Sequence, residues 1–421
     1  MRSGAVDHGA GRLLAQIVWM PNKFRARRRA RRVSPDTRRE RLSVISPQRR
    51  RGSTMTLFLA IVGFVLLVAG AELLVRASVR LAAIAGISPL VVGLTVVALG
   101  TSAPELAVGI QSARAGQPDL TLGNVVGSNI SNVLLILGIA ALIAPLVVHQ
   151  KLVRIDVPIM IGASALALLL SLDGMISRLE GAILVVLLVV YTGWSIRASR
   201  KETRAVKAEY AEAFGVSEKK KEKLHPIIDV ILVVVGLVML VYGAGFLVDG
   251  AVVLAKVLGV DELLIGLTVV AVGTSLPEIA TSVIASLRGE RDIAVGNVVG
   301  SNVFNIFGVL GASALVSQHG IAVDPGAVRF DIPVMIAASV ACLPIFFRGY
   351  RIVRWEAALL LGHYFAYVTY AVLRATGHAA LVPYTWFMLA FVLPLTTITL
   401  IVVLVRELRN TRRNTRDKAD A

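Results

Sequence analysis

Apolar residues occur along the chain in runs of about 20, separated by short polar segments. Runs of this length and composition are typical of helices that cross a membrane. A longer polar stretch at 200–226 separates two sets of five runs, and one further run follows the second set. The pattern predicts helices near 56–77, 89–113, 121–147, 154–172, 178–198, 227–254, 262–287, 294–317, 328–347, 353–375 and 382–406.

The two sets are copies of one sequence. GLTVVALGTSAPELAVGI at 93–110 is repeated as GLTVVAVGTSLPEIATSV at 266–283, and GNVVGSNISNVLLILG at 123–138 as GNVVGSNVFNIFGVLG at 296–311. Both pairs are offset by 173 residues without a gap. An odd number of helices per copy makes the second copy enter the membrane upside down relative to the first. The chain is therefore predicted to be an inverted repeat, the architecture of many secondary transporters.

The expected fold class is an all-α integral membrane protein. It has a ten-helix core of two inverted five-helix repeats and an extra C-terminal helix, to which the sequence assigns no function. The expected segments are a basic disordered tail or mis-assigned start at 1–54, repeat 1 at 55–199, a cytoplasmic linker at 200–226, repeat 2 at 227–376, and the extra helix with a basic cytoplasmic tail at 377–421.

Composition agrees with a membrane protein, because 56% of the residues are hydrophobic and only 17% are charged. The net charge of +17 could indicate a nucleic-acid partner, but the basic residues gather at the two ends and in short loops. No nucleic-acid partner is therefore expected. Met55 directly precedes the first apolar run, so we favour a start there over a disordered or targeting tail. Cys342 is the single cysteine, which excludes a disulfide or cysteine-based metal site within one chain.

The basic loops predict the orientation. Lys and Arg residues follow the odd-numbered helices and occur in the 200–226 linker and the C-terminal tail, while the opposite loops hold several aspartates. By the positive-inside rule the basic loops face the cytoplasm. We therefore expect a multi-pass protein of the cytoplasmic (inner) membrane, with its N-terminus outside and its C-terminus in the cytoplasm.

Each repeat places a carboxylate inside an apolar run. In GTSAPE, Gly100 and Pro104 disfavour a continuous helix, and freed backbone carbonyls in an apolar slab need partners. Thr101 and Ser102 add hydroxyl oxygens next to Glu105. Ionisable residues at membrane depth are costly and indicate a functional site by default. The same arrangement returns in the second repeat as Gly273, Thr274, Ser275, Pro277 and Glu278.

The second motif adds hydroxyl and amide groups. These are Ser128, Asn129 and Asn132, which Ser301, Asn302 and Asn305 repeat. Ser128 and Asn132 share a helix face. All of these ligand atoms are oxygens, which suit hard cations such as Ca²⁺ and Na⁺. The charges of two carboxylates balance that of one Ca²⁺, and the same oxygens could hold Na⁺ instead. Binding of one ion would then exclude the other, which makes exchange possible. Two asparagines that follow glycines, Asn124 and Asn297, are interpreted as helix caps. Two glycines are expected to permit close helix packing, Gly127 and Gly300.

GTSAPE and GNVVGSN, doubled and inverted, resemble the sodium/calcium exchanger (cation/Ca²⁺ antiporter) superfamily, especially its bacterial and archaeal members. The resemblance covers about 57–375 and implies a ten-helix core with cation sites at its centre. The implied ligands are Thr101, Ser102, Glu105, Ser128, Asn132, Thr274, Ser275, Glu278, Ser301 and Asn305, with the backbone carbonyls of Ala98 and Ala271. Some members have Asp at the position of Asn305, which leaves K⁺ dependence and stoichiometry open.

The expected function is secondary active antiport of Ca²⁺ and Na⁺ by alternating access. Ca²⁺/H⁺ antiport, with the two glutamates taking protons, is the alternative within transport. A cation channel is the alternative from another class, although channels usually build their pore by rotational symmetry. An enzyme is not expected, because the sequence offers no nucleophile–base pair. The expected partners are the two ions as substrates and the lipid bilayer, with no cofactor and no protein partner identified.

Overall fold

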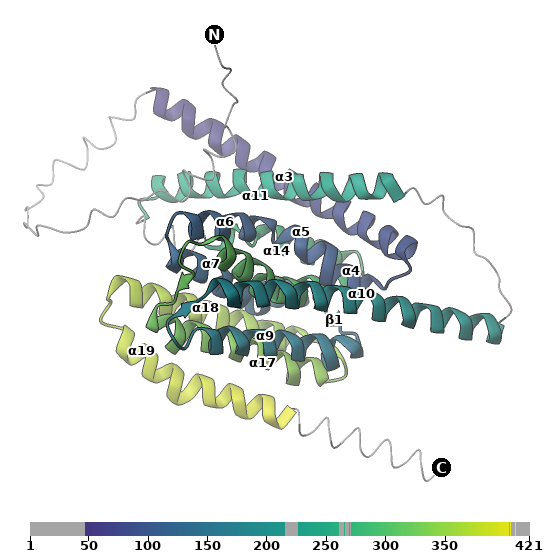
Figure 1. Ribbon diagram of the computed structural model, residues 1–421. Coiled ribbons are helices and arrows are strands. Elements are labelled where there is room, and N and C mark those ends of the chain that lie inside the picture. Colours follow the sequence, from purple (N-terminus) through teal and green to yellow (C-terminus); the bar gives the residue numbers. More distant parts are fainter. Residues whose placement is uncertain are drawn as a thin grey trace, which may run out of the picture.

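The computed structural model describes residues 47–214, 226–260, 265, 269, 271–403, 405 and 409. Almost all of the described chain is helical, which confirms the all-α membrane fold. Nine of the described helices are long and apolar enough to cross a membrane, and one bent pair of helices forms a further span. Figure 1 colours these helices along the sequence, with the first repeat in purple to teal and the second in teal-green to yellow.

The first repeat contains five spans. They are α3 (Pro47–Ala85); the bent span of α4 (Pro89–Val92), η1 (Gly93–Val97), α5 (Ala98–Thr101) and α6 (Ala103–Arg114); the span of α7 (Pro118–Ser131), η2 (Asn132–Ile136) and α8 (Leu137–Ile143); the span of η3 (Leu152–Asp156) and α9 (Val157–Leu170); and α10 (Arg178–Phe214).

The second repeat follows the same order. It has α11 (Pro226–Val257); α13 (Ala271–Gly273) and α14 (Leu276–Leu287); the span of α15 (Arg291–Phe304), η5 (Asn305–Leu310) and α16 (Gly311–Val316); the span of η6 (Ala327–Asp331) and α17 (Ile332–Phe347); and α18 (Arg354–Thr376). The extra C-terminal helix comprises α19 (Leu381–Phe387) and η7 (Met388–Val392) and continues to Val403.

Short strands join the two repeats in a reciprocal way. β1 (Leu146–Val147) in repeat 1 pairs antiparallel with β4 (Arg351–Ile352), and β2 (Met175–Ile176) pairs with β3 (Ile321–Ala322). Each pair links the end of a third helix in one repeat to the start of a fifth helix in the other. This exchange is the pattern of contacts expected from a pseudo-two-fold axis between inverted repeats.

Helices α3 and α11 cross at matched glycines. A methyl group on Gly63 would lie 2.6 Å from the Gly243 carbonyl oxygen, and one on Gly70 would lie 2.8 Å from that of Gly236. The backbones touch at these points, because only glycine leaves room for such an approach. In Figure 1 these two helices lie side by side along one face of the molecule, at the top of the view.

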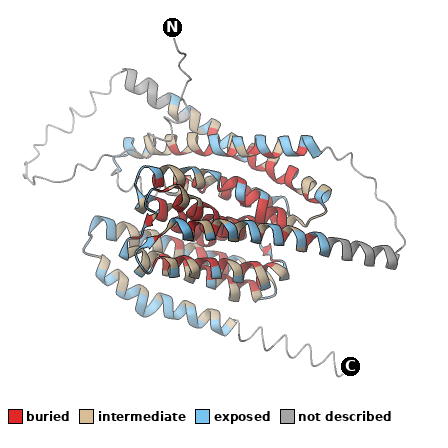
Figure 2. Ribbon diagram, in the orientation of Figure 1, coloured by how far each residue is buried: buried red, intermediate tan, exposed pale blue. Residues whose placement is uncertain are grey.

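The polar motifs lie on the most buried helices. In the most apolar 18-residue window of each span, 100% of Arg291–Val316 and 78% of Pro118–Ile143 is buried, against 33% of Phe58–Ala85 and 28% of Pro226–Val257. Figure 2 shows the same distribution, with buried residues gathered in the central helices and exposed ones on the outer helices. The centre of the bundle is therefore shielded from the surroundings by the remaining spans.

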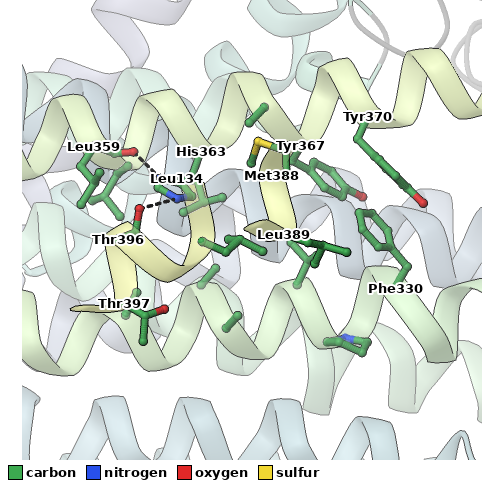
Figure 3. A pocket seen from close by; sticks show the side chains of 18 of the residues that line it. Leu134, Phe330, Leu359, His363, Tyr367, Tyr370, Met388, Leu389, Thr396 and Thr397 are labelled. Carbon is green, nitrogen blue, oxygen red and sulfur yellow. Dashed lines mark hydrogen bonds between the residues drawn. The ribbon is translucent and has the colours of Figure 1, made fainter. Parts of the chain in front are cut away.

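The extra helix lies at the margin of the bundle, next to α17 and α18 (Figure 1). None of its most apolar window is buried. A cavity of about 420 Å³ separates it from the core and is lined mainly by apolar side chains (Figure 3). His363 bridges the gap, with Nδ1 2.8 Å from the Leu359 carbonyl oxygen and Nε2 3.3 Å from the Thr396 hydroxyl. None of the expected cation ligands lines this cavity.

Two helix boundaries differ from the expectation. α3 begins at Pro47 rather than near residue 56, and α10 continues to Phe214 rather than ending near 198. In both places a helix extends past its apolar run into a charged segment, where strong helix formers such as Arg, Lys, Glu and Ala allow it to continue. Residues 1–46 of the expected tail at 1–54, residues 215–225 of the expected linker at 200–226, and much of 261–270 lie outside the described residues.

Candidate cation-binding centre

The two GTS motifs break their helices, as the glycine and proline positions predict. The backbone at Ser102 has φ −84° and ψ 11°, and that at Ser275 has φ −86° and ψ 5°. The first break bends its span by 46°. After each break a new helix begins with a proline near its N-terminus, a position where the missing N–H costs nothing. Glu105 and Glu278 fall in the first turns of these helices, where the helix dipole favours negative charge.

The two carboxylates meet at the centre of the bundle. Each glutamate is only 1% exposed. The Ser102 hydroxyl donates to Glu278 Oε1 over 2.9 Å, so a hydroxyl of repeat 1 holds the carboxylate of repeat 2. Thr274 of repeat 2 lies beside the carboxylate of Glu105, and the two glutamates lie close enough to interact electrostatically. The structure thus brings together two like charges that the sequence placed 173 residues apart.

The second motif supplies the neighbouring ligands from α7 and α15. The Ser128 hydroxyl lies 3.5 Å from Glu105 Oε1. Asn132 and Asn305 each stand at the first residue of a π-helical segment, η2 and η5. Such segments shift the register of a helix and occur often at functional sites. α7 packs against α13, and α15 against α5, so the ligand helix of one repeat faces the broken helix of the other.

Many oxygens in this centre have no hydrogen-bond partner. Twelve buried side-chain atoms in the described residues lack one, and six of them belong to the expected ligand set: Glu105 Oε2, Asn132 Oδ1, Ser275 Oγ, Glu278 Oε2, Ser301 Oγ and Asn305 Oδ1. Buried polar atoms are almost always paired, so a concentration of unpaired oxygens indicates a missing positive partner. Cations with oxygen ligands, such as Ca²⁺ and Na⁺, fit this donor set.

The centre differs from a usual protein metal site in its charge. No cluster of three or more His, Cys, Asp or Glu side chains that could hold a metal occurs in the part of the chain that the structure describes. Most oxygens here are neutral hydroxyls and amides, with two carboxylates among them. A low formal charge is suited to a cation that must also leave, because tight binding would prevent transport.

The backbone carbonyls of Ala98 and Ala271 lie one turn before the breaks. The Ala98 oxygen accepts the Ser102 amide over 3.0 Å and lies 3.4 Å from the Thr101 hydroxyl, which also donates to it. In the second repeat the Ser275 amide instead bonds to the Val272 oxygen over 3.1 Å. The two breaks are therefore similar but not identical in their backbone hydrogen bonds.

The interpretation of Asn124 and Asn297 as helix caps was wrong. Their helices begin earlier, at Pro118 and Arg291, so both residues lie inside a helix. The Asn124 amide donates to the backbone oxygen of Glu105 over 3.0 Å. Asn297 Oδ1 accepts the Thr101 hydroxyl over 3.1 Å, and its Nδ2 lies 3.0 Å from Ser282 Oγ. Both asparagines therefore support the broken helices, and only their exact repetition at an offset of 173 residues could have suggested this.

Close packing at Gly300 is confirmed. A methyl group there would lie 2.5 Å from the backbone oxygen of Leu94, which cannot move aside. The corresponding neighbour of Gly127 falls within 266–268, outside the described residues. Gly300 allows α15 to approach η1 closely. This approach places Ser301 and Asn305, which follow Gly300 in the same span, near the centre.

Comparison with known proteins gives one consistent family. The family model for "Sodium/calcium exchanger protein" matches residues 55–197 and 228–373. The inner membrane protein YrbG of Escherichia coli is 38% identical over 289 residues, which cover 67% of this chain and 86% of that protein. The sodium/calcium exchanger MaX1 of Methanosarcina acetivorans is 33% identical over 344 residues, or 75% of this chain and 98% of that one.

A third relative and a solved structure agree. The putative antiporter CaxA of Alkalimonas amylolytica is 37% identical over 314 residues, covering 73% of this chain and 95% of the relative. The sodium-calcium exchanger NCX_Mj, solved after soaking with 10 mM Na⁺ and no Ca²⁺, superposes with a TM-score of 0.64 at 28% identity. The superposition covers 75% of this chain and 99% of that structure.

Proposed function

The chain belongs to the sodium/calcium exchanger family, and from this premise we propose that it exchanges Ca²⁺ for Na⁺ across the cytoplasmic membrane as a secondary active antiporter. The membership makes it a multi-pass membrane protein of a cation antiporter family. Family membership alone does not identify the driving ion, and Na⁺ is our proposal. It rests on the donor set at the centre, and the printed names of MaX1 and NCX_Mj support it.

One observation carries the proposal. Six buried oxygens that have no hydrogen-bond partner among the described residues lie on the two broken helices and the two ligand helices that face them. The formal charge of the candidate site comes from Glu105 and Glu278, because the hydroxyl and amide groups are neutral. One Ca²⁺ neutralises both carboxylates, and Na⁺ ions can use the same oxygens, so occupancy by one ion excludes the other. The proposed ligands are the ten side chains and two carbonyls named from the sequence.

The reciprocal contacts support alternating access. The strand pairs, the α3–α11 crossing and the hydrogen bonds at the centre all link one repeat to the other in matched pairs. A site on the axis between inverted repeats can be opened to either side by related movements of the two halves. Na⁺ entry would then drive Ca²⁺ export. The basic loops support a cytoplasmic C-terminus and an outward N-terminus.

Ca²⁺/H⁺ exchange is the second candidate, favoured by the proximity of Glu105 and Glu278. Two like charges in a buried site repel each other, and a proton could relieve this repulsion in place of Na⁺.

Transport in proteoliposomes distinguishes the two. The purified protein is reconstituted, and uptake of radiolabelled Ca²⁺ is measured with outward gradients of Na⁺, K⁺ or protons imposed separately. Na⁺/Ca²⁺ exchange predicts uptake with the Na⁺ gradient and no uptake with the proton gradient alone. Uptake driven only by protons would replace the proposal with the second candidate. Ca²⁺ flux that needs no counter-ion would indicate a channel.

A further inference from the structure

We propose that Asn129 and Asn302, which are absent from the expected ligand set, are positioning residues for the cation centre. Each orients the side-chain amide of an asparagine in the opposite repeat, so that its oxygen, rather than its NH₂ group, faces the cations. The asparagines that they orient are Asn305 and Asn132, respectively. The inference rests on the proposed function, because it concerns the same site.

The orientation of Asn129 is determined by a backbone carbonyl. Its Nδ2 lies 3.3 Å from the carbonyl oxygen of Asn302 and 3.5 Å from Met335 Sδ. A carbonyl oxygen can only accept a hydrogen bond, so the NH₂ group of Asn129 must face it. Its Oδ1 is then directed to the other side, where it accepts Nδ2 of Asn305 over 3.1 Å.

The effect passes on to Asn305. Since its NH₂ group donates to Asn129, its own oxygen points away from that residue and has no hydrogen-bond partner in the described part of the protein. Asn305 is 1% exposed, so bulk solvent does not reach this oxygen. The unpaired oxygen is the atom that a cation would use. A backbone carbonyl therefore determines, through Asn129, which end of Asn305 is presented.

The other half of the centre has a similar arrangement, in which a methionine sulfur, and no backbone carbonyl among the described residues, accepts from the positioning asparagine. Nδ2 of Asn302 lies 3.3 Å from Met160 Sδ, which here can only accept. Oδ1 of Asn302 accepts Nδ2 of Asn132 over 3.0 Å, and Oδ1 of Asn132 is left without a partner among the described residues. Each bond crosses between repeats, so the ligand of one repeat is oriented by the other.

These bonds matter because an amide has two nearly equal orientations. Rotation of Asn305 by half a turn about its last side-chain bond exchanges oxygen and nitrogen without changing its shape. The rotated form would present a donor to a positive ion and lose one ligand. The hydrogen bond from Asn305 to Asn129 is the contact that distinguishes the two forms. A carboxylate at position 305 would not need it, because both of its ends are acceptors.

The test is a double-mutant cycle on Ca²⁺-dependent transport. Asn129→Ala should raise the Ca²⁺ concentration for half-maximal uptake about tenfold, the value of one lost hydrogen bond. The maximal rate should change less. In an Asn305→Asp background the same Asn129→Ala change should cost less than about twofold, because either carboxylate oxygen can face the ion. Such a rescue is not expected if Asn129 only fills space.

The inverted repeat provides a matched control. Asn129→Ala in an Asn132→Asp background should retain the full loss, since Asn132 is held by Asn302. The mirror pair, Asn302→Ala with Asn132→Asp, should again show rescue. Size-exclusion chromatography in detergent checks folding, and if either alanine variant aggregates, the same cycle is measured with Asn129→Ser and Asn302→Ser, which cannot span the gap.

The outcomes are separable from the proposed function. Equal losses from Asn129→Ala with and without the Asn305→Asp substitution would assign Asn129 to packing and overturn the inference. An unchanged Ca²⁺ dependence in the single variants would also overturn it. If instead the unmodified protein shows no cation-driven Ca²⁺ uptake, the proposed function fails, while loss of transport confined to the variants leaves it standing.

Discussion

The carboxylate of Glu278 offers the sharpest test of the cation centre. It is 1% exposed, its Oε1 is held by the Ser102 hydroxyl over 2.9 Å, and its Oε2 has no partner among the described residues. Glu278→Gln keeps the shape and the acceptor for Ser102, removes the charge and places an NH₂ group where a cation would bind. Packing should therefore survive while Ca²⁺ binding is lost, and Glu105→Gln should behave alike as its counterpart in the first repeat.

The size of the effect follows from the charges. Two unit charges about 4 Å apart interact by ~4 kcal/mol at an effective dielectric constant of about 20, so a divalent ion loses ~8 kcal/mol. The carboxylate no longer has to be desolvated, which returns several kcal/mol. A net loss of about 3 kcal/mol corresponds to roughly 100-fold weaker Ca²⁺ binding. A monovalent ion loses only half the Coulomb term, so Na⁺ binding should change far less than Ca²⁺ binding.

Thermal unfolding with and without Ca²⁺ measures this loss directly. A ligand at about 100 times its Kd stabilises a protein by about 2.7 kcal/mol, and a roughly 100-fold increase in Kd reduces the stabilisation to about 0.4 kcal/mol. Ca²⁺ should therefore raise the Tm of the unmodified protein and scarcely that of Glu278→Gln, which should also lose Ca²⁺ uptake. Asp156→Asn is the matched control. This carboxylate is also buried but bonds to the Tyr191 hydroxyl over 3.0 Å, and its loss should leave the Ca²⁺ shift intact.

The reasoning is refuted if Glu278→Gln is well folded and keeps the full Ca²⁺ shift and near-normal uptake. It is also refuted if Asp156→Asn abolishes the shift as completely, because the effect would then belong to any buried carboxylate rather than to the cation centre.

Three further changes test the fold around the centre. Gly300→Ala should prevent correct folding, because its methyl group would lie 2.5 Å from a backbone oxygen, while the control Gly162→Ala meets no neighbour within 4 Å and should be tolerated. The stability of the two variants in detergent measures the difference, and a stable Gly300→Ala would contradict the prediction. Arg80→Gln should destabilise the protein by about 1–3 kcal/mol, because Asp229 pairs with it over 2.6 Å and would remain buried without this partner. Thermal unfolding measures the loss, and an unchanged Tm would show that the pair contributes little. A chain beginning at Met55 should insert and transport normally, since the preceding segment is rich in arginine and contains no apolar run of membrane length; loss of uptake would show that it is needed.

Local sequence determined which segments cross the membrane and where two of them break. Apolar run length needs no tertiary information, because the bilayer thickness sets it. The breaks at Ser102 and Ser275 follow from nearby glycine and proline, whose effects act within one helical turn. The exact repeat also predicted the inverted architecture, since an odd helix count fixes the relative orientation of two copies. The repeated polar positions predicted the residues of the expected centre.

Contacts between distant residues decided the rest. Asn124 and Asn297 looked like caps because a glycine precedes each, yet α7 and α15 begin earlier and bring these side chains to the broken helices. The π-helical turns at Asn132 and Asn305 have no local signature.

The crossed pairs at the centre join residues that are 170 to 176 positions apart. No periodicity within either repeat can encode such pairs. They exist because two inverted copies pack face to face, so that each copy completes and orients the polar groups of the other. The sequence therefore determined which oxygens are available, and the packing of the two repeats decided where each of them points.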